Sequence, residues 1–272
     1  MVVALTVAGS DSIGGAGIQA DIKAMASMGV HPASVITCVT SQNTKGVSAI
    51  LPIPIDHIIS QLEAVLGDAD VMAIKIGMLY SQEIADAVAT RLATEGSPMV
   101  VDPVMVAGVG DSLQGKGLLK ALREKIIPLA SLVTPNRSEA ETLTGKKVRD
   151  LSEAKVACLS ISELGAGGVL LKGGHFEGDQ VIDLLYFEEE FIEVRAPRVE
   201  VRPHGSGCNL SSYITGYLAL GVELKDAVIS ARSRLIDALE AHYPVGEGLE
   251  VLDSLATLNR EAQRYITLIE LE

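Results

Sequence analysis

Tryptophan is absent from this chain of 272 residues, and aromatic residues make up only 3% of it. Apolar residues nevertheless reach 48%, so a core has to be built from aliphatic side chains and methionine. This length suits one large α/β domain or two small ones. Because no linker of distinct composition interrupts the sequence, we expect a single domain over residues 1–272.

Positive charge is also scarce. The 22 lysine and arginine residues are outnumbered by 35 aspartate and glutamate residues, which leaves a formal net charge of −13. Proteins that bind nucleic acid need a basic surface for the phosphate backbone, so we expect no nucleic-acid partner. An anionic small molecule is not excluded, because a few backbone amides and one lysine can hold a phosphate group.

Cysteine is rare, and long apolar runs are missing. The three cysteines, Cys38, Cys158 and Cys208, are far apart and show neither disulfide nor metal-ligand spacing, which is typical of a reducing cytoplasm. No run is long enough to span a bilayer, so we expect no membrane partner. The chain opens directly on the apolar run Val2–Ala8, which favours a first strand over a signal peptide.

Apolar strand-like runs alternate with segments of helical spacing through the first half of the chain. Such repetition predicts a mostly parallel sheet with helices on its faces. Polar or glycine-bearing turns follow four of these strands, at Gly9–Asp11, Gln42–Asn43, Gly77–Met78 and Asp102–Pro103. Ligands bind outside the carboxyl ends of parallel strands, so these four turns should meet in one crevice.

Three later segments carry simpler patterns. The glycine-rich segment 108–117 predicts a mobile loop. The runs Gln180–Tyr186 and Glu190–Val194 predict an antiparallel hairpin. Spaced leucines after residue 249 predict a C-terminal helical extension over residues 249–272.

The stretch Arg202–Ser211 predicts a glycine turn that opens a helix. Pro203 blocks a helix before it, while Gly205 and Gly207 permit unusual backbone angles. Free amides and the macrodipole at a helix N-terminus favour an anion, and a thiol in the first turn favours the thiolate. We therefore expect phosphate chemistry here, with Cys208 as a candidate reactive group.

Seven segments between Val3 and His242 are weak signals one by one and specific in combination. They are Ala8–Asp21, Gln42–Thr44, Lys75–Met78, Asp102–Met105, Thr134–Asn136, Leu171–His175 and His204–Cys208. Together they resemble the hydroxymethylpyrimidine/phosphomethylpyrimidine kinases of thiamine biosynthesis, a family of the ribokinase-like superfamily.

The resemblance implies a fold and a reaction. The fold is a ribokinase-like, three-layer α/β/α domain around a central, mostly parallel sheet. The reaction is ATP-dependent phosphorylation, with Mg²⁺, of 4-amino-5-hydroxymethyl-2-methylpyrimidine and then of its monophosphate.

The resemblance also implies roles for individual residues. The pyrimidine would be held by Gly9, Ala16, Asp21, Gln42, Met78 and Val104. The nucleotide would be bound by Asn136, Lys172 and Ser206, and the magnesium ion by Asp102 and Glu139. The transferring phosphoryl group would be stabilised at the turn formed by Gly205, Gly207 and Cys208.

Cys208 distinguishes branches of this superfamily. Many of its sugar kinases carry aspartate at this place as the general base, and a cysteine resembles the pyrimidine and pyridoxal branch. Its thiolate would either accept the hydroxymethyl proton or line the anion site, and both roles stay open. Three residues depart from the family pattern: Ile13 where glycine is usual, and Ser206 and Asn209 where threonine is usual.

Two alternative functions remain. One is a pyridoxal or pyridoxine kinase, because these rings are similar in size to the pyrimidine. The other is a non-catalytic regulatory protein that binds pyrimidine, which the departures at Ile13 and Asn209 motivate. We also expect a homodimer, from the apolar C-terminal segment and from the family's tendency.

Overall fold

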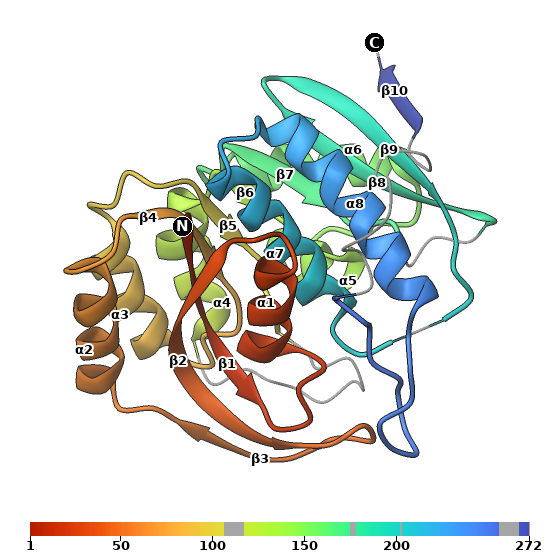
Figure 1. The fold of residues 1–272 in the computed structure, drawn as a ribbon. Helices are drawn as coiled ribbons and strands as arrows, with labels where there is room; N and C mark the ends of the chain where they lie inside the picture. The colour runs from red at the N-terminus through yellow and green to blue at the C-terminus, as the bar shows by residue number, and fades with distance from the viewer. Residues whose placement is uncertain (106–116, 175–177, 202, 256–266, 272) are drawn as a thin grey trace.

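The computed structural model describes residues 1–105, 117–174, 178–201, 203–255 and 267–271, and most of the predicted mobile loop lies outside them. Its sheet has ten strands in the order β10-β9-β8-β7-β6-β5-β4-β1-β2-β3 (Figure 1). The strands are β1 (Val3–Asp11), β2 (His31–Gln42), β3 (Val47–Pro52), β4 (Val71–Ile76), β5 (Met99–Val101), β6 (Leu132–Val133), β7 (Gly168–Leu171), β8 (Gln180–Phe187), β9 (Glu190–Pro197) and β10 (Thr267–Leu271).

The centre of the sheet, from β2 across β1, β4, β5 and β6 to β7, is parallel. Antiparallel strands extend it at both ends, with β3 beside β2 and the hairpin β8–β9 beside β7. The predicted hairpin is therefore confirmed. Short strands buried on both faces suit the continuous Val, Ile and Leu runs of this sequence.

Helices cover both faces of the sheet (Figure 1). The helical segments are α1 (Gly17–Ala26), α2 (Ile55–Leu66), α3 (Gln82–Leu92), α4 (Leu118–Ala121) with its continuation to Leu129, α5 (Arg137–Thr144), α6 (Leu151–Ser162), α7 (Ser206–Ala219) and α8 (Leu224–Glu240). Helices α1, α7 and α8 pack on one face, and α2 to α6 on the other. The predicted three-layer α/β/α architecture is confirmed.

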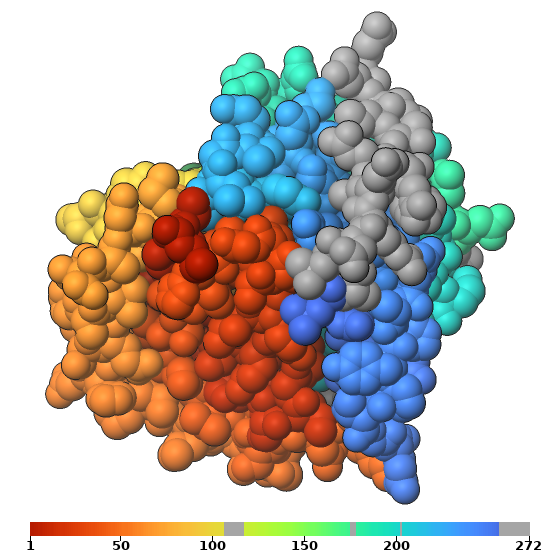
Figure 2. Space-filling view, in the orientation of Figure 1, coloured from red at the N-terminus to blue at the C-terminus, as the bar shows by residue number. Residues whose placement is uncertain are grey.

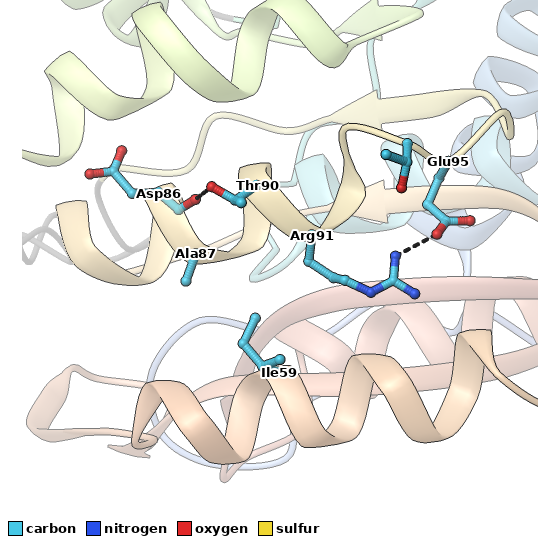
Figure 3. A pocket seen from close by; sticks show the side chains of 7 residues that line it. Ile59, Asp86, Ala87, Thr90, Arg91 and Glu95 are labelled. Carbon is cyan, nitrogen blue, oxygen red and sulfur yellow. Dashed lines mark hydrogen bonds and ion pairs between the residues drawn. The ribbon is translucent and has the colours of Figure 1, made fainter.

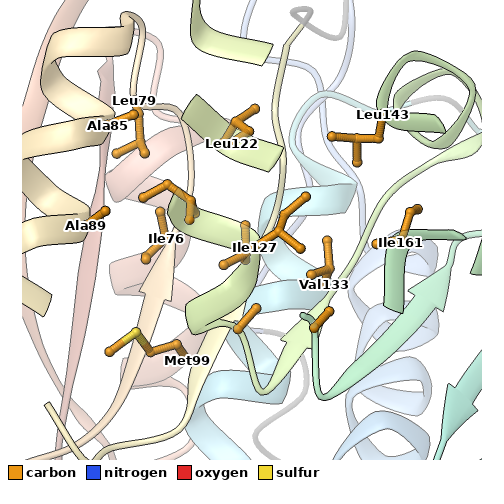
Figure 4. Packing of buried hydrophobic residues seen from close by; sticks show 14 of the residues in the cluster. Ile76, Leu79, Ala85, Ala89, Met99, Leu122, Ile127, Val133, Leu143 and Ile161 are labelled. Carbon is orange, nitrogen blue, oxygen red and sulfur yellow. The ribbon is translucent and has the colours of Figure 1, made fainter. Parts of the chain in front are cut away.

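Two aliphatic cores hold the layers together. The larger joins the sheet to α2–α6, and Figure 4 shows Ile76 of β4 and Val133 of β6 facing Ala85 and Leu143 from the helices. The smaller core centres on the buried Tyr213 of α7. Aliphatic packing therefore replaces the aromatic residues that the sequence lacks.

The C-terminal segment differs from the prediction. Residues 249–255 are not helical, and residues 256–266 lie outside the described part of the chain. From Thr267 to Leu271 the chain forms strand β10, antiparallel to β9. The helix prediction is wrong for both described parts, because pairing with the open edge of β9 satisfies the backbone of 267–271.

The segment after α8 returns to the N-terminal half of the molecule. Figure 2 shows it, in dark blue, beside the red and orange residues of the first strands and helix. The backbone amides of Gly248 and Leu249 donate to the hydroxyl and carbonyl oxygens of Thr44. Among the described helices, none has both the length and the apolar character needed to cross a membrane.

Candidate active site

One pocket of about 1690 Å³ opens at the carboxyl ends of the parallel strands. It is lined by all but one of the site residues that the sequence predicts: Gly9, Ala16, Gln42, Met78, Asp102, Val104, Asn136, Glu139, Lys172, Gly205, Ser206, Gly207 and Cys208. All four predicted segments contribute to this lining, so the prediction of one shared crevice is confirmed. Two of them are strand ends and not turns, because β1 continues to Asp11 and β2 to Gln42. The residue that is missing from the lining is Asp21.

The charged end of the pocket, here called the phosphate corner, consists of Asp102, Glu139, Lys172 and the first turn of α7. Lys172 Nζ donates to Asp102 Oδ1 at 2.8 Å and lies 3.8 Å from Glu139 Oε2. The two carboxylates are almost completely buried, and one lysine faces both. The corner thus holds one cation against two acids, an arrangement that favours a further cation.

The electrostatics of this corner are visible in its pKa values. Burial raises the pKa of Glu139 to about 7, Lys172 opposes that shift, and Asp102 adds to it. Burial alone would lower the pKa of Lys172, but Asp102 and Glu139 raise it above its ordinary value. Lys172 is therefore charged at neutral pH, whereas Glu139 retains its proton to a higher pH than an ordinary glutamate and populates both the protonated and the ionised form near pH 7.

Helix α5 places Glu139 in this corner. Asn136 is the N-cap of α5, and its side-chain oxygen accepts from the Glu139 backbone amide. In return, Glu139 Oε2 accepts from the Asn136 backbone amide at 2.7 Å. This reciprocal pair is a capping box. Because the Asn136 side chain is used in the cap, its predicted contact with the nucleotide stays a prediction.

Helix α7 supplies the anion site that the glycine turn predicts. Its N-cap, Gly205, has φ +89°, and a β-carbon there would overlap the carbonyl oxygen of Gly15. A β-carbon on Gly207 would lie 3.1 Å from Lys172 Nζ and 3.6 Å from Asp102 Oδ2. Gly205 therefore lets the start of α7 pack against the glycine loop, and Gly207 lets the first turn of α7 approach Lys172 and Asp102.

Cys208 lines the pocket, but its thiol differs from the prediction. Burial raises the pKa of Cys208 to about 11, although the neighbouring Lys75 opposes the shift. Asp102 and Asp21 raise it further. This raised pKa does not agree with the expectation of a thiolate at the helix N-terminus, because burial and two nearby carboxylates favour the protonated thiol.

Another part of the pocket lining is apolar. Met78 and Val104 line it, and Met78 Sδ lies 3.9 Å from the buried thiol of Cys38. Gly9 lies next to this wall, and a β-carbon on it would come within 2.8 Å of Cys38 Sγ. A flat aromatic ring suits such a wall, which is consistent with the predicted roles of Gly9, Met78 and Val104.

Asp21 lies beneath the pocket and is fully buried. Its Oδ1 accepts from Lys75 Nζ at 2.5 Å and from Ser212 Oγ at 2.7 Å, and its Oδ2 accepts from Thr6 Oγ1 at 2.6 Å. Direct contact with the pyrimidine stays a prediction, and this geometry does not favour it. Helical spacing alone did not reveal that an acid on α1 has a lysine partner on β4.

Lys75 is the site residue to which the sequence prediction assigned no role. It is completely buried, pairs with Asp21 and lines the pocket. Burial would lower its pKa, but Asp21 and Cys208 raise it above the ordinary value. The available signal was a single charged residue within the apolar strand β4, because a lysine buried there requires a partner.

Two departures from the family pattern have plain structural settings. The backbone amide of Ile13 donates to Asp11 Oδ1, so the loop is closed without a contribution from its side chain. Asn209 is buried beside the pocket, where its Nδ2 donates to the Gly205 carbonyl oxygen and its Oδ1 accepts from Ser254 Oγ. Asn209 thus connects α7 to the segment that follows α8.

A second, open groove lies between α2 and α3 (Figure 3). Its lining includes Ile59, Asp86, Thr90 and Arg91. The Arg91 guanidinium is engaged by Glu95, as Figure 3 shows, and by a glutamate of α2. With its cation neutralised within the groove, this surface offers no chemistry comparable to that of the phosphate corner.

Comparisons with known proteins agree with this geometry. Residues 11–253 match the family described as phosphomethylpyrimidine kinase. A hydroxymethylpyrimidine/phosphomethylpyrimidine kinase of Rhizobium meliloti is 44% identical over 250 residues, which cover 90% of this chain and 94% of the relative.

Two solved structures extend the comparison. The pyridoxal kinase of Staphylococcus aureus in complex with pyridoxal superposes with a TM-score of 0.90 at 32% identity, covering 100% of this chain and 99% of that protein. The phosphomethylpyrimidine kinase of Clostridium difficile gives a TM-score of 0.78 at 40% identity, covering 88% and 100%. The expected ribokinase-like fold is confirmed, and the chain belongs to the phosphomethylpyrimidine kinase family.

Proposed function

We propose that this protein transfers the terminal phosphoryl group of ATP to 4-amino-5-hydroxymethyl-2-methylpyrimidine and then to its monophosphate. One observation carries the proposal: an apolar ring wall at Met78 and Val104 shares a single pocket with the phosphate corner. The family and the relatives, which are named as kinases of this kind, support the same reaction.

In the proposed reaction the chain mainly positions groups and stabilises charge. Lys172 and the amides of the first turn of α7 would hold the transferring phosphoryl group, because negative charge develops on its oxygens. Met78 and Val104 would hold the ring so that its hydroxymethyl group faces this turn. Cys208, protonated at neutral pH, would line the anion site and orient the hydroxyl group.

Asp102 and Glu139 fit a magnesium ion. Both are oxygen donors that border the pocket, and the described residues hold no cluster of three or more potential metal ligands. Mg²⁺ commonly takes one or two carboxylates and completes its shell with water and phosphate oxygens. When bound, it would neutralise charge on the nucleotide phosphates.

The test is a turnover assay on purified protein. ATP, Mg²⁺ and the hydroxymethylpyrimidine should yield ADP and the pyrimidine monophosphate, and the monophosphate should yield the diphosphate. Pyrimidine binding by calorimetry without any turnover would instead indicate the non-catalytic alternative. Light scattering in the same buffer would test the expected homodimer.

A pyridoxal kinase activity is the second candidate. The observation that favours it is the superposition with the pyridoxal-bound kinase over the whole chain. The higher sequence identity to pyrimidine kinases favours the first candidate. The ratio of kcat/KM for the pyrimidine and for pyridoxal decides between them, and a ratio below one would reverse the assignment.

A further inference from the structure

The glycine loop after β1 is held by a buried carboxylate. Asp11 Oδ2 accepts from the backbone amides of Gly15 and Ala16 at 2.9 and 2.8 Å. The same oxygen lies 2.9 Å from His204 Nε2. Burial would raise the pKa of Asp11, but the His204 and backbone hydrogen bonds lower it below the ordinary value. Asp11 is thus an ionised acceptor with no proton to donate.

This acceptor determines where His204 carries its proton. His204 is buried and comes directly before the turn of α7. An ionised carboxylate cannot donate to Nε2, so Nε2 must donate to Asp11. The proton of the His204 ring therefore resides on Nε2, and this nitrogen cannot accept a hydrogen bond.

The side-chain amide of Gln42 also contacts His204 Nε2. One of its two terminal atoms is 2.9 Å from His204 Nε2. The structure has the amide nitrogen of Gln42 at this position, where it would face the N–H of Nε2. We therefore exchange the two terminal atoms, so that the Nε2 proton is shared between Asp11 Oδ2 and the amide oxygen of Gln42 in a three-centre hydrogen bond. The assignment exchanges two atoms that have nearly the same size, and it changes no contact distance.

Thr40 supports this orientation independently. Its hydroxyl group lies 3.0 Å from the carbonyl oxygen of Ser10 and 3.2 Å from the other terminal atom of Gln42. A hydroxyl group has one proton, and the Ser10 carbonyl can only accept it. Thr40 must then accept from Gln42, which requires the amide nitrogen at that position.

We infer that Asp11 and His204 fix the Gln42 amide so that it presents an N–H donor to the pocket that holds the ring. One hydrogen of the amide nitrogen reaches Thr40, which leaves the second hydrogen for a ligand in the pocket that Gln42 lines. The ligand group it selects is an unprotonated ring nitrogen, and His204 acts as a positioning residue.

This inference rests on the proposed function, because it concerns how the pyrimidine is recognised. Its test compares the hydroxymethylpyrimidine with two analogues in which one ring nitrogen, N1 or N3, is replaced by C–H. Calorimetry without ATP measures each dissociation constant. At least one analogue should bind the unaltered protein about tenfold more weakly, because a donor is left without an acceptor.

Variants distinguish a role of His204 in positioning the Gln42 amide from a merely structural role. His204→Phe should reduce the discrimination between pyrimidine and analogue to within about twofold, as should Gln42→Met, because neither leaves a fixed donor. A merely structural role of His204 would weaken both ligands equally and leave their ratio unchanged. Gln61→Met is the matched control, since the Gln61 amide is bonded to Ile36 outside the pocket and its loss should leave the ratio unaltered.

A measurement without ligand tests the proton assignment on the unaltered protein. Nitrogen-15 NMR of the His204 ring should show the proton on Nε2, and a proton on Nδ1 alone would overturn the inference. Equal binding of the pyrimidine and both analogues would overturn it as well. If the pyrimidine is neither bound nor phosphorylated, the proposed function itself fails, which is a different outcome from turnover with unchanged discrimination.

Discussion

Lys75 and Lys172 are two lysines that pair with aspartates, at 2.5 and 2.8 Å, and both interact electrostatically with Cys208. The first pair is closed: Lys75 and Asp21 are both 0% exposed, and Asp21 also accepts two hydroxyl hydrogen bonds. The second is open: Lys172 retains 13% exposure and shares two acids.

The difference in exposure and in the number of partners determines whether each pair can interact with a ligand. A closed pair neutralises itself and has no capacity left for a ligand, so its contribution is to the folded state and to the potential around Cys208. An open pair with an extra carboxylate has unbalanced charge at a pocket, which a magnesium ion and phosphate oxygens can balance. The same residue types thus stabilise the fold in one place and, in the proposed function, would bind ligand in the other.

The largest expected effect falls on the closed pair. Lys75→Met should lower the free energy of unfolding by about 3–5 kcal/mol, because it leaves the Asp21 carboxylate buried without its cation. Urea unfolding followed by circular dichroism measures this loss. The double variant Lys75→Met/Asp21→Leu should recover most of it, and a double variant no more stable than the single one would contradict the closed-pair interpretation.

The next effect falls on the open pair. Lys172→Met should lower kcat by about 10²–10³-fold, the usual cost of removing one donor that stabilises developing charge. Its effect on stability should be smaller than that of Lys75→Met, since it relieves a partly solvated site. Steady-state kinetics and urea unfolding on the same preparation measure the effects on rate and on stability. The distinction between the open and the closed pair would be contradicted if Lys172→Met unfolded the protein and Lys75→Met did not.

A smaller effect is expected at the thiol of Cys208. Cys208→Ala should lower kcat about tenfold and leave the dissociation constant of the pyrimidine within about twofold, because a protonated thiol orients the hydroxyl group but is a weak base. Single-turnover kinetics and calorimetry measure the two quantities. An unchanged rate would remove Cys208 from the reaction, and a loss above 10³-fold would restore it as the general base.

The pH dependence of alkylation provides the finest test. The pKa of Cys208 is raised to about 11 from an ordinary value of 9.0, so the thiolate fraction should still rise about tenfold per pH unit between pH 8 and 10. Iodoacetamide labelling, quantified on the Cys208 peptide by mass spectrometry, should show no plateau in that range. A plateau below pH 9 would mean that Lys75 outweighs burial and the two aspartates.

Much of the site could be predicted because it lies at chain positions with a local signature. Lys172 follows a buried strand and precedes glycines, and Gly205 and Gly207 precede a helix. Parallel strands bring such turns to one edge whatever their distance along the chain. The convergence of four strand ends was therefore accessible before any coordinates.

Other features had no local signature. The role of Asp21 depends on a lysine 54 residues away, and helical periodicity does not report partners across a sheet. The tail from Thr267 to Leu271 forms a strand because β9 offers an open edge, which leucine spacing cannot reveal. The raised pKa of Cys208 depends on burial by several elements at once, and the macrodipole argument considered only its own helix.

By itself the sequence determined the fold class, the reaction class and the turns that would meet, because these follow from hydrophobic periodicity and from short motifs. Only the tertiary structure determined which partner each charged side chain has and how far it is shielded from water. It closed Lys75 onto Asp21, left Lys172 facing the pocket, and set His204 between Asp11 and Gln42. The physical reason is that pairing and desolvation depend on distances across the folded chain, which neither periodicity nor motif spacing contains.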